Sequence, residues 1–149
     1  MVTLDERALA PARASIEHER KAAIHGLVAE NHFALAEGAA GPYELRLGIV
    51  ETRLVFDVRS QTGEPVAKFE LPLTPLGKIM RNYFIVYDFY FHAIKTLTVS
   101  QIETIDVGRR SLHDEGAAEV RDSLSNRVDI DRGTARRLFT LICALYNRR

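Results

Sequence analysis

The spacing of apolar residues separates a strand-rich middle of the chain from helical segments on either side. Between residues 43 and 71, apolar and polar residues alternate with the period of two that is typical of a half-buried strand. Two breaks interrupt the alternation, one at Glu51-Thr52 and one at residues 61–64, where Gly63 can adopt positive φ. This pattern predicts an antiparallel β-meander with one buried face and one face in water. Short strands are also predicted at residues 2–4 and 33–36, the latter as an edge strand, and an extended segment at 127–130.

Helical periodicity marks the other segments. Helices are predicted from Ser15 to about Asn31, from Thr74-Pro75 through the aromatic run 83–91, from Ser100 to Leu124, and from Asp131 onward. The run 83–91 (YFIVYDFYF) has more apolar residues than one helical stripe needs, so we expect this helix to be central in the core or covered by a second subunit. The predicted fold is therefore one α+β domain over residues 1–149. In it, a small antiparallel β-meander packs on one face against about four helices, as a single pair of layers, with 83–91 as the central helix.

The segment Ser100–Leu124 places charges on its own apolar stripe. Ser100 and Glu103 have the spacing of a capping box, which predicts the start of the helix, and Gly116 is expected to kink or split it. At about 100° per residue, the apolar residues at 102, 105, 112, 120 and 124 share one side with Asp106, Arg109 and His113. Charges on such a stripe must be paired, or must face a cleft or a partner.

This charged cluster has the components of a small anion-binding site. Asp106 is spaced to pair with Arg109 or with Arg110, and Arg109 precedes His113 by about one helical turn. Arginine can hold a carboxylate or phosphate in a bidentate fork, and histidine can transfer protons near neutral pH. The candidate ligand or partner site comprises Asp106, Arg109, Arg110, His113 and Glu115. The same residues could instead form an ion-pair network that only fixes helix packing, and catalytic residues cannot be assigned.

Composition narrows the function classes. Lys plus Arg and Asp plus Glu are 20 each, so no net field favours nucleic acid or an acidic membrane, although the end of the chain from Arg121 is rich in arginine. The single cysteine, Cys143, lies in an apolar helix and is expected to be buried. The absence of an apolar leader or membrane-length stretch predicts a cytoplasmic protein. His18, His25 and His32 are too far apart along a helix for any two to share one metal ion, so no metal site and no cofactor are expected.

Catalytic sequence motifs are also missing. The chain has no phosphate-binding glycine loop, no dinucleotide fingerprint, no zinc-protease helix motif and no nucleophile elbow. Two hypotheses of different class remain. The first is a non-catalytic interaction or regulatory module, with a homodimer or another protein as partner. The alternative is a small enzyme or sensor that binds an anionic metabolite at the Arg/His/Glu cluster of residues 100–116.

Several strings together resemble one known family. They are SIEHER (15–20), GPYELRL (41–47), VETRLVFDV (50–58), SQIETIDVGRRSLHDEG (100–116) and TARRLFTLICAL (134–145). In the same order and over nearly the whole chain, they resemble uncharacterised protein family 0262, a bacterial family found mainly in α-proteobacteria. The resemblance implies a cytoplasmic location, and it carries no activity, cofactor or catalytic residue over to this chain.

Overall fold

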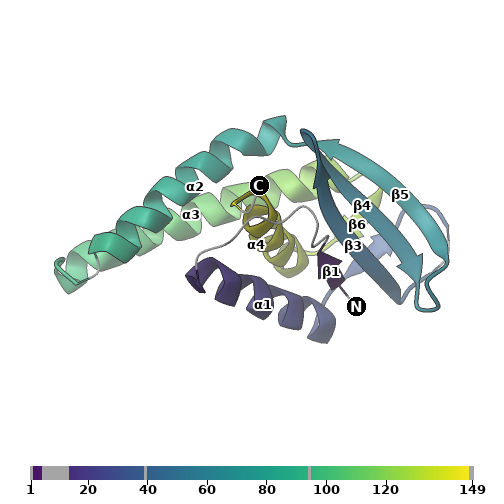
Figure 1. Cartoon of the computed structure of the whole chain (residues 1–149), viewed down its shortest axis with the longest axis horizontal. Helices are drawn as coiled ribbons and strands as arrows, with labels where there is room; N and C mark the ends of the chain where they lie inside the picture. The colour runs from purple at the N-terminus through teal and green to yellow at the C-terminus, as the bar shows by residue number, and fades with distance from the viewer. Residues whose placement is uncertain (1, 5–13, 39, 94, 148–149) are drawn as a thin grey trace.

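A computed structural model describes residues 2–4, 14–38, 40–93 and 95–147, and the side chains of 16–38, 40–90 and 95–146. It confirms the predicted α+β class, with an antiparallel meander in the middle of the chain and helices before and after it (Figure 1). In chain order the elements are β1 (Val2–Leu4), α1 (Ala14–Ala29), β2 (Phe33–Leu35), β3 (Tyr43–Val50), β4 (Arg53–Ser60), β5 (Pro65–Pro72), α2 (Thr74–Ala93), α3 (Val99–Leu124), β6 (Val128–Ile130) and α4 (Arg132–Asn147).

The predicted β-meander is confirmed as β3, β4 and β5, which pair antiparallel in sequence order. The tight turn after β3 has Glu51 at φ 57°, and the next turn has Gly63 at φ 89°, a conformation that glycine adopts without a Cβ penalty. Apolar side chains opposite one another face the core, and Phe56 stacks on Phe69 with ring centroids 5.0 Å apart. The alternation in the sequence thus reported the buried face correctly.

The two short strands predicted at residues 2–4 and 33–36 both exist, and they pair with different sheets. β1 extends the sheet by pairing parallel with β3, so that Val2 lies opposite Leu45. The strand predicted at 33–36 exists as β2, but it is not an edge strand of the meander. It pairs antiparallel with β6, with Phe33 opposite Ile130, and forms a separate two-stranded sheet.

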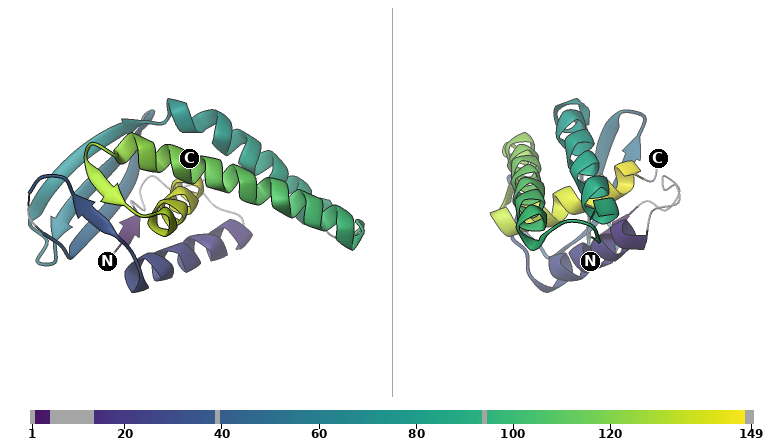
Figure 2. Two further views of the ribbon diagram at one scale, coloured as in Figure 1. Left: turned by 180° about the vertical axis from the view of Figure 1, so that it is seen from behind. Right: turned by 90° about the vertical axis from the view of Figure 1, so that its left-hand side faces the viewer.

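The central helix is α4, and the prediction that residues 83–91 would be central is wrong. In both views α4 lies between α1 and α3, and it contacts each of them (Figures 1 and 2). Nine residues of α4, numbered 134, 135, 138, 139 and 141–145, are buried. The aromatic run does form a helix, but α2 pairs with α3 as a long hairpin that leaves Ile85 66% and Phe89 55% exposed. Phe91 lies outside the residues whose side chains are described.

Two local predictions for α3 are also corrected. The N-cap is Thr98 rather than Ser100: Gln101 N donates to Thr98 Oγ1 (3.2 Å), and Thr98 N donates to Gln101 Oε1 (3.0 Å). Gly116 does not split the helix, which is continuous from Val99 to Leu124. It lies directly against Phe139 of α4, where a Cβ would be 2.2 Å from the ring, so its role is to allow close approach of the two helices.

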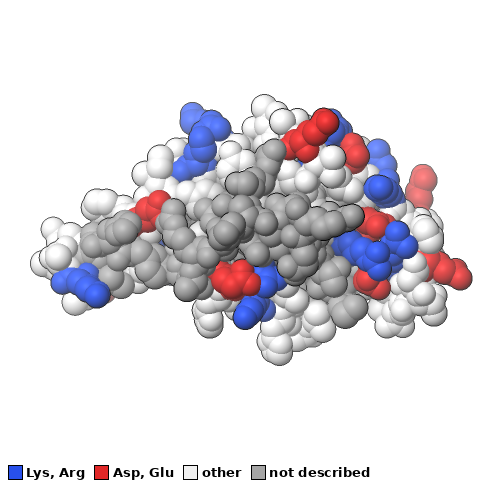
Figure 3. Space-filling model, in the orientation of Figure 1, with Lys and Arg blue, Asp and Glu red and all other residues white. Residues whose placement is uncertain are grey.

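The exposed surface carries charges of both signs. On the outer face of the sheet, Arg53 Nε donates to Glu70 Oε2 at 2.9 Å, and Arg46 pairs with Glu44 at 3.0 Å. Basic and acidic side chains accordingly lie beside one another over the sheet in Figure 3. Within the described residues, no helix is both long and apolar enough to cross a membrane.

Candidate functional site

A cleft of about 400 Å³ opens where α1, α2, α3 and α4 meet, beside the charged cluster of α3. Its charged and polar lining consists of Glu19 from α1, Tyr83 from α2, Arg109, Arg110 and His113 from α3, and Arg136, Arg137 and Thr140 from α4. Ala22 and Ala23 complete the wall on α1. We refer to this hollow as the arginine cleft. Its four arginines come from two helices that the sequence separates by the whole of β6.

Arg109 lies at the junction of three helices. Its Nη2 donates to Asp106 Oδ1 at 2.7 Å, and its Nη1 lies 3.9 Å from Glu19 Oε1. The nearby hydroxyl of Tyr83 also interacts with this guanidinium. Burial lowers the pKa of Arg109, but the hydrogen bond with Asp106 and the interaction with Tyr83 outweigh burial and raise it. Arg109 therefore stays charged although its side chain is only 26% exposed.

Asp106 holds two guanidinium groups at once. Besides Arg109, it pairs with Arg110 Nε at 3.2 Å, as the helical spacing predicts. The hydrogen bond from Arg109 lowers the pKa of Asp106, so the carboxylate is ionised at neutral pH. Arg110 keeps 60% of its side chain exposed at the cleft mouth.

His113 forms part of the cleft wall, and its hydrogen bonds fix its tautomer. Thr140 Oγ1 donates its only hydrogen to the carbonyl of Arg136 (3.2 Å), so at the 2.8 Å contact His113 Nε2 must be the donor to Thr140. His113 Nδ1 is then a bare acceptor, and it is buried without a hydrogen-bond partner among the described residues. The ring packs edge-on against Phe139 and Tyr83, with centroids 5.2 and 5.8 Å apart.

This environment keeps His113 neutral. Burial lowers its pKa to about 4, and the positive charges of Arg136 and Arg109 act in the same direction. At neutral pH the imidazole is therefore uncharged, with one nitrogen already donating to Thr140. Such a group positions its neighbours and lines a binding surface, and it carries no proton for an acid step.

The arginines of α4 are anchored by groups beside the cleft. Arg136 forms an ion pair with Asp114 of α3, which also contacts Arg132 at 3.4 Å. Arg137 Nη1 donates to the carbonyl of Glu30 at 2.8 Å, and its side chain crosses over Gly26 of α1. These contacts direct the side chains along the cleft instead of leaving them free in solvent.

Two further lining groups have perturbed protonation. Burial raises the pKa of Glu19, and the charges of Arg109 and His18 only partly oppose that effect. Burial, followed by the nearby Glu19 and Cys143, raises the pKa of Tyr83, whose hydroxyl stays protonated. Among the described residues, the cleft lining thus combines four arginines, three of them paired with Asp106 or Asp114 beside the cleft, with one carboxylate, Glu19, that is easier to neutralise than usual.

The five residues proposed from the sequence do not all meet here. Arg109, Arg110 and His113 line the cleft, and Asp106 supports two of them from the side of α3. Glu115 is exposed on α3 and is not part of the lining. Sequence reasoning missed Glu19, Tyr83 and Thr140 entirely. It noted Arg136 and Arg137 only as members of a basic C-terminal segment, and that excess of arginine was the one signal for them.

The described residues contain no group of three or more His, Cys, Asp or Glu side chains placed to hold a metal ion. Cys143 is 4% exposed, and burial raises the pKa of its thiol. The described lining of the cleft offers guanidinium groups, hydroxyl groups and an imidazole for ion pairing and hydrogen bonding.

Comparison with known proteins gives one consistent result. The sequence profile of an uncharacterised protein family (UPF0262) matches residues 1–148. A UPF0262 protein of Rhodopseudomonas palustris strain BisB18 is 48% identical over 145 residues, covering 97% of this chain and 89% of the relative. A UPF0262 protein of Xanthobacter autotrophicus is 45% identical over 146 residues, with the same two coverages. No solved structure matches the chain significantly. The chain therefore belongs to the uncharacterised protein family UPF0262, as its sequence strings indicated.

Proposed function

We propose that this protein is a non-catalytic regulatory module of the cytoplasm that binds a small anionic metabolite in the arginine cleft. The observation that carries the proposal is the convergence of Arg109, Arg110, Arg136 and Arg137 on one cleft, whose described lining includes a single carboxylate, Glu19. Guanidinium groups recognise phosphate and carboxylate oxygens in paired hydrogen bonds, so these two anion classes fit best.

The arrangement supports binding more than catalysis. A general acid or base should titrate near the working pH, whereas His113 has a pKa of about 4 and donates to Thr140. Cys143 is buried and offers no accessible nucleophile. The remaining functional groups are fixed cations that attract an anion and hold it in place.

The proposal is tested by differential scanning fluorimetry of the full chain with inorganic phosphate, phosphate monoesters and di- and tricarboxylates. A ligand present at about one hundred times its Kd stabilises the folded state by about 2.7 kcal/mol. For a chain of this size that corresponds to a rise in Tm of roughly 5–10 °C. The expected result is such a rise with at least one of these anions.

Two variants assign the response to the cleft. Arg109→Ala removes the central cation and should abolish most of the shift. Arg53→Ala, on the outer face of the sheet and paired with Glu70, is the matched control and should keep it. The proposal fails if no anion in the screen raises the wild-type Tm, or if Arg109→Ala responds as the wild type does.

A second candidate function, self-association through the α2–α3 hairpin, rests on a separate observation. Ile85 and Phe89 are spaced to share one face of α2, and both are more than half exposed. Exposed apolar side chains on a projecting helix are typical of a contact surface. We propose a homodimer on this face. Multi-angle light scattering should give twice the monomer mass for the wild type and a monomer for Phe89→Glu, with Val50→Glu, 57% exposed on β3, as the control. A monomeric wild type would remove this candidate and leave the arginine cleft untouched.

A further inference from the structure

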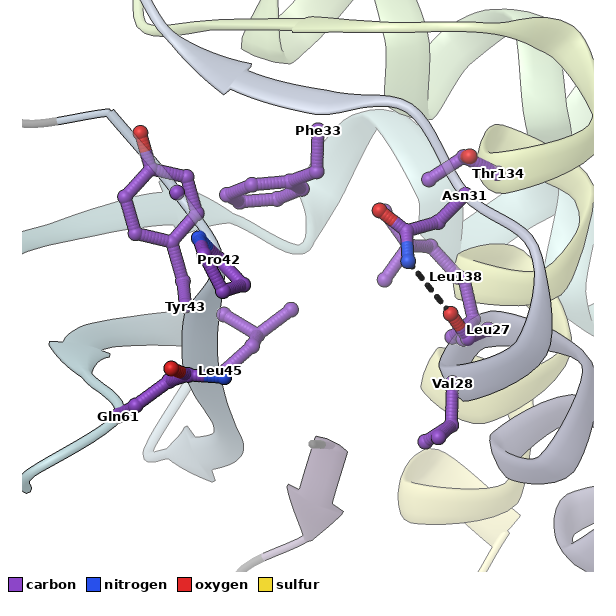
Figure 4. A pocket seen from close by; sticks show the side chains of 11 residues that line it. Leu27, Val28, Asn31, Phe33, Pro42, Tyr43, Leu45, Gln61, Thr134 and Leu138 are labelled. Carbon is purple, nitrogen blue, oxygen red and sulfur yellow. Dashed lines mark hydrogen bonds between the residues drawn. The ribbon is translucent and has the colours of Figure 1, made fainter.

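A second cavity, of about 320 Å³, lies nearer the end of α1, at Leu27 and Val28, and shares none of its described lining residues with the arginine cleft. It is enclosed by the end of α1, the starts of β2 and β3, and the first turns of α4 (Figure 4). Its apolar lining consists of Leu27, Val28, Phe33, Pro42, Tyr43, Leu45 and Leu138. The polar members are Asn31, Gln61 and Thr134. We propose that this cavity binds a small neutral aromatic molecule that carries one hydrogen-bond donor.

The residues that line the cavity favour an uncharged ligand. None of the described side chains that line the cavity is a Lys, Arg, Asp or Glu. An ion that entered would lose its hydration and gain no counter-charge, which is a large cost in apolar surroundings. The expected ligand is therefore uncharged, in contrast to the ligand of the arginine cleft.

The volume and the aromatic walls indicate the size and shape of the ligand. An engineered apolar protein cavity of about 150 Å³ is large enough to bind benzene, and this cavity is roughly twice that size. Phe33 and Tyr43 form one wall, edge to face, with centroids 6.0 Å apart at 70°. A bicyclic aromatic molecule can pack against these rings in a preferred offset or edge geometry.

The hydrogen bonds that Asn31 and Thr134 already make indicate which polar group the ligand carries. Asn31 Nδ2 donates to the carbonyl of Leu27 at 2.7 Å, which fixes the carboxamide and leaves Oδ1 as the open acceptor (Figure 4). That oxygen is turned toward the cavity in Figure 4. Thr134 Oγ1 already accepts from His32 N at 2.9 Å. Asn31 Oδ1 is thus one side-chain acceptor in the lining, and we assign it to a ligand N–H or O–H.

Indole and benzofuran form a matched pair of probes, because they have nearly the same shape and only indole has an N–H donor. Titration calorimetry of the full chain should give saturable binding of both, with indole about fivefold tighter, as expected for one net hydrogen bond. Asn31→Ala should bring the two affinities to within about twofold of each other. Equal affinities for the two probes in the wild type would overturn the assignment of Asn31.

A bulky substitution at the entrance of the cavity tests whether the probes bind inside it. Val28 is 56% exposed on α1 at the rim, and Val28→Trp should fill the entrance and weaken both probes at least tenfold. Val50→Trp is the matched control, since Val50 is 57% exposed and lies outside the cavity, and it should bind as the wild type does. The proposal is overturned if the wild type binds neither probe at millimolar concentration, or if Val28→Trp binds as well as Val50→Trp. A failure here leaves the anion response of the arginine cleft untouched, because that response depends on Arg109.

Discussion

Two glycines of α3 should respond in opposite ways to the same substitution. At Gly116, an added Cβ would lie 2.2 Å from Cε1 and 2.3 Å from Cζ of Phe139. At Gly108, eight residues earlier on the same helix, an added Cβ would meet no atom within 4 Å. Alanine therefore changes helix propensity equally at both positions but creates a steric conflict at only one.

The magnitudes follow from this difference. Alanine in place of glycine in a helix interior gains roughly 0.5–1 kcal/mol, and Gly108→Ala should raise the free energy of unfolding by that amount. Ordinary contact begins near 3.4 Å, so Gly116→Ala forces Phe139 to move by more than about 1 Å. The ring is fully buried and packs edge-on against Tyr83 and His113, which restrict its movement. Overpacking of this kind costs about 1–3 kcal/mol or more, so we expect a net loss of roughly 2 kcal/mol.

Urea unfolding followed by circular dichroism measures both changes in the free energy of unfolding. In thermal unfolding, the two variants should differ in Tm by roughly 5–10 °C. Phe139→Leu in the Gly116→Ala background should recover part of the lost free energy of unfolding, because leucine is smaller and leaves room for the added Cβ. The double-mutant cycle would then show favourable coupling. A Gly116→Ala protein at least as stable as Gly108→Ala would refute the close packing of α3 against α4.

Three further outcomes follow from local contacts. His113 has a folded pKa of about 4, below its unfolded value, so the unfolded chain binds more protons and stability should fall as the pH drops from about 6.5 toward 4. The loss from pH 7 to 5.5 should be about 1 kcal/mol in urea titrations and should be absent in His113→Gln. Thr98→Ala should lower the free energy of unfolding by about 1 kcal/mol, whereas Ser100→Ala, inside the helix, should change it by less than about 0.5 kcal/mol. Cys143 is 4% exposed with a raised thiol pKa, so a thiol reagent should modify it only as fast as the chain unfolds; rapid labelling of the native protein would contradict its burial.

The elements that the sequence predicted well are those whose burial is set by their own periodicity. Alternation predicted β3, β4 and β5 and their buried faces. The helix predicted from Asp131 is confirmed as α4, and Asp131 caps it, since Thr134 N donates to its Oδ1 at 2.8 Å. The start of α3 was wrong because two overlapping capping boxes, from Thr98 and from Ser100, satisfy the same local pattern. Only the path of the chain into the helix decides between them.

The rest of the candidate site depends on tertiary packing, which periodicity does not report. The charged stripe of α3 located Arg109, Arg110 and His113, but the residues that complete the cleft come from α1, α2 and α4. Glu115 was included because it is close in sequence, although two residues along a helix turn a side chain by about 200° from His113. The aromatic run 83–91 was misplaced for a related reason: high apolar content does not distinguish a central helix from a projecting one.

The helix α4 contributes residues to both proposed binding sites. Binding at either site should therefore raise the free energy of global unfolding. The buried residues of α4 hold the core, while Thr140 and Arg136 face the arginine cleft and Leu138 lines the apolar cavity. A ligand raises the free energy of unfolding in full only when the element it contacts opens together with the whole fold. Because α4 packs against α1, α3 and β3, it cannot detach without exposing the core. Ligand contacts on either face of this helix should therefore raise the midpoint of global unfolding, and not only the free energy of a local opening.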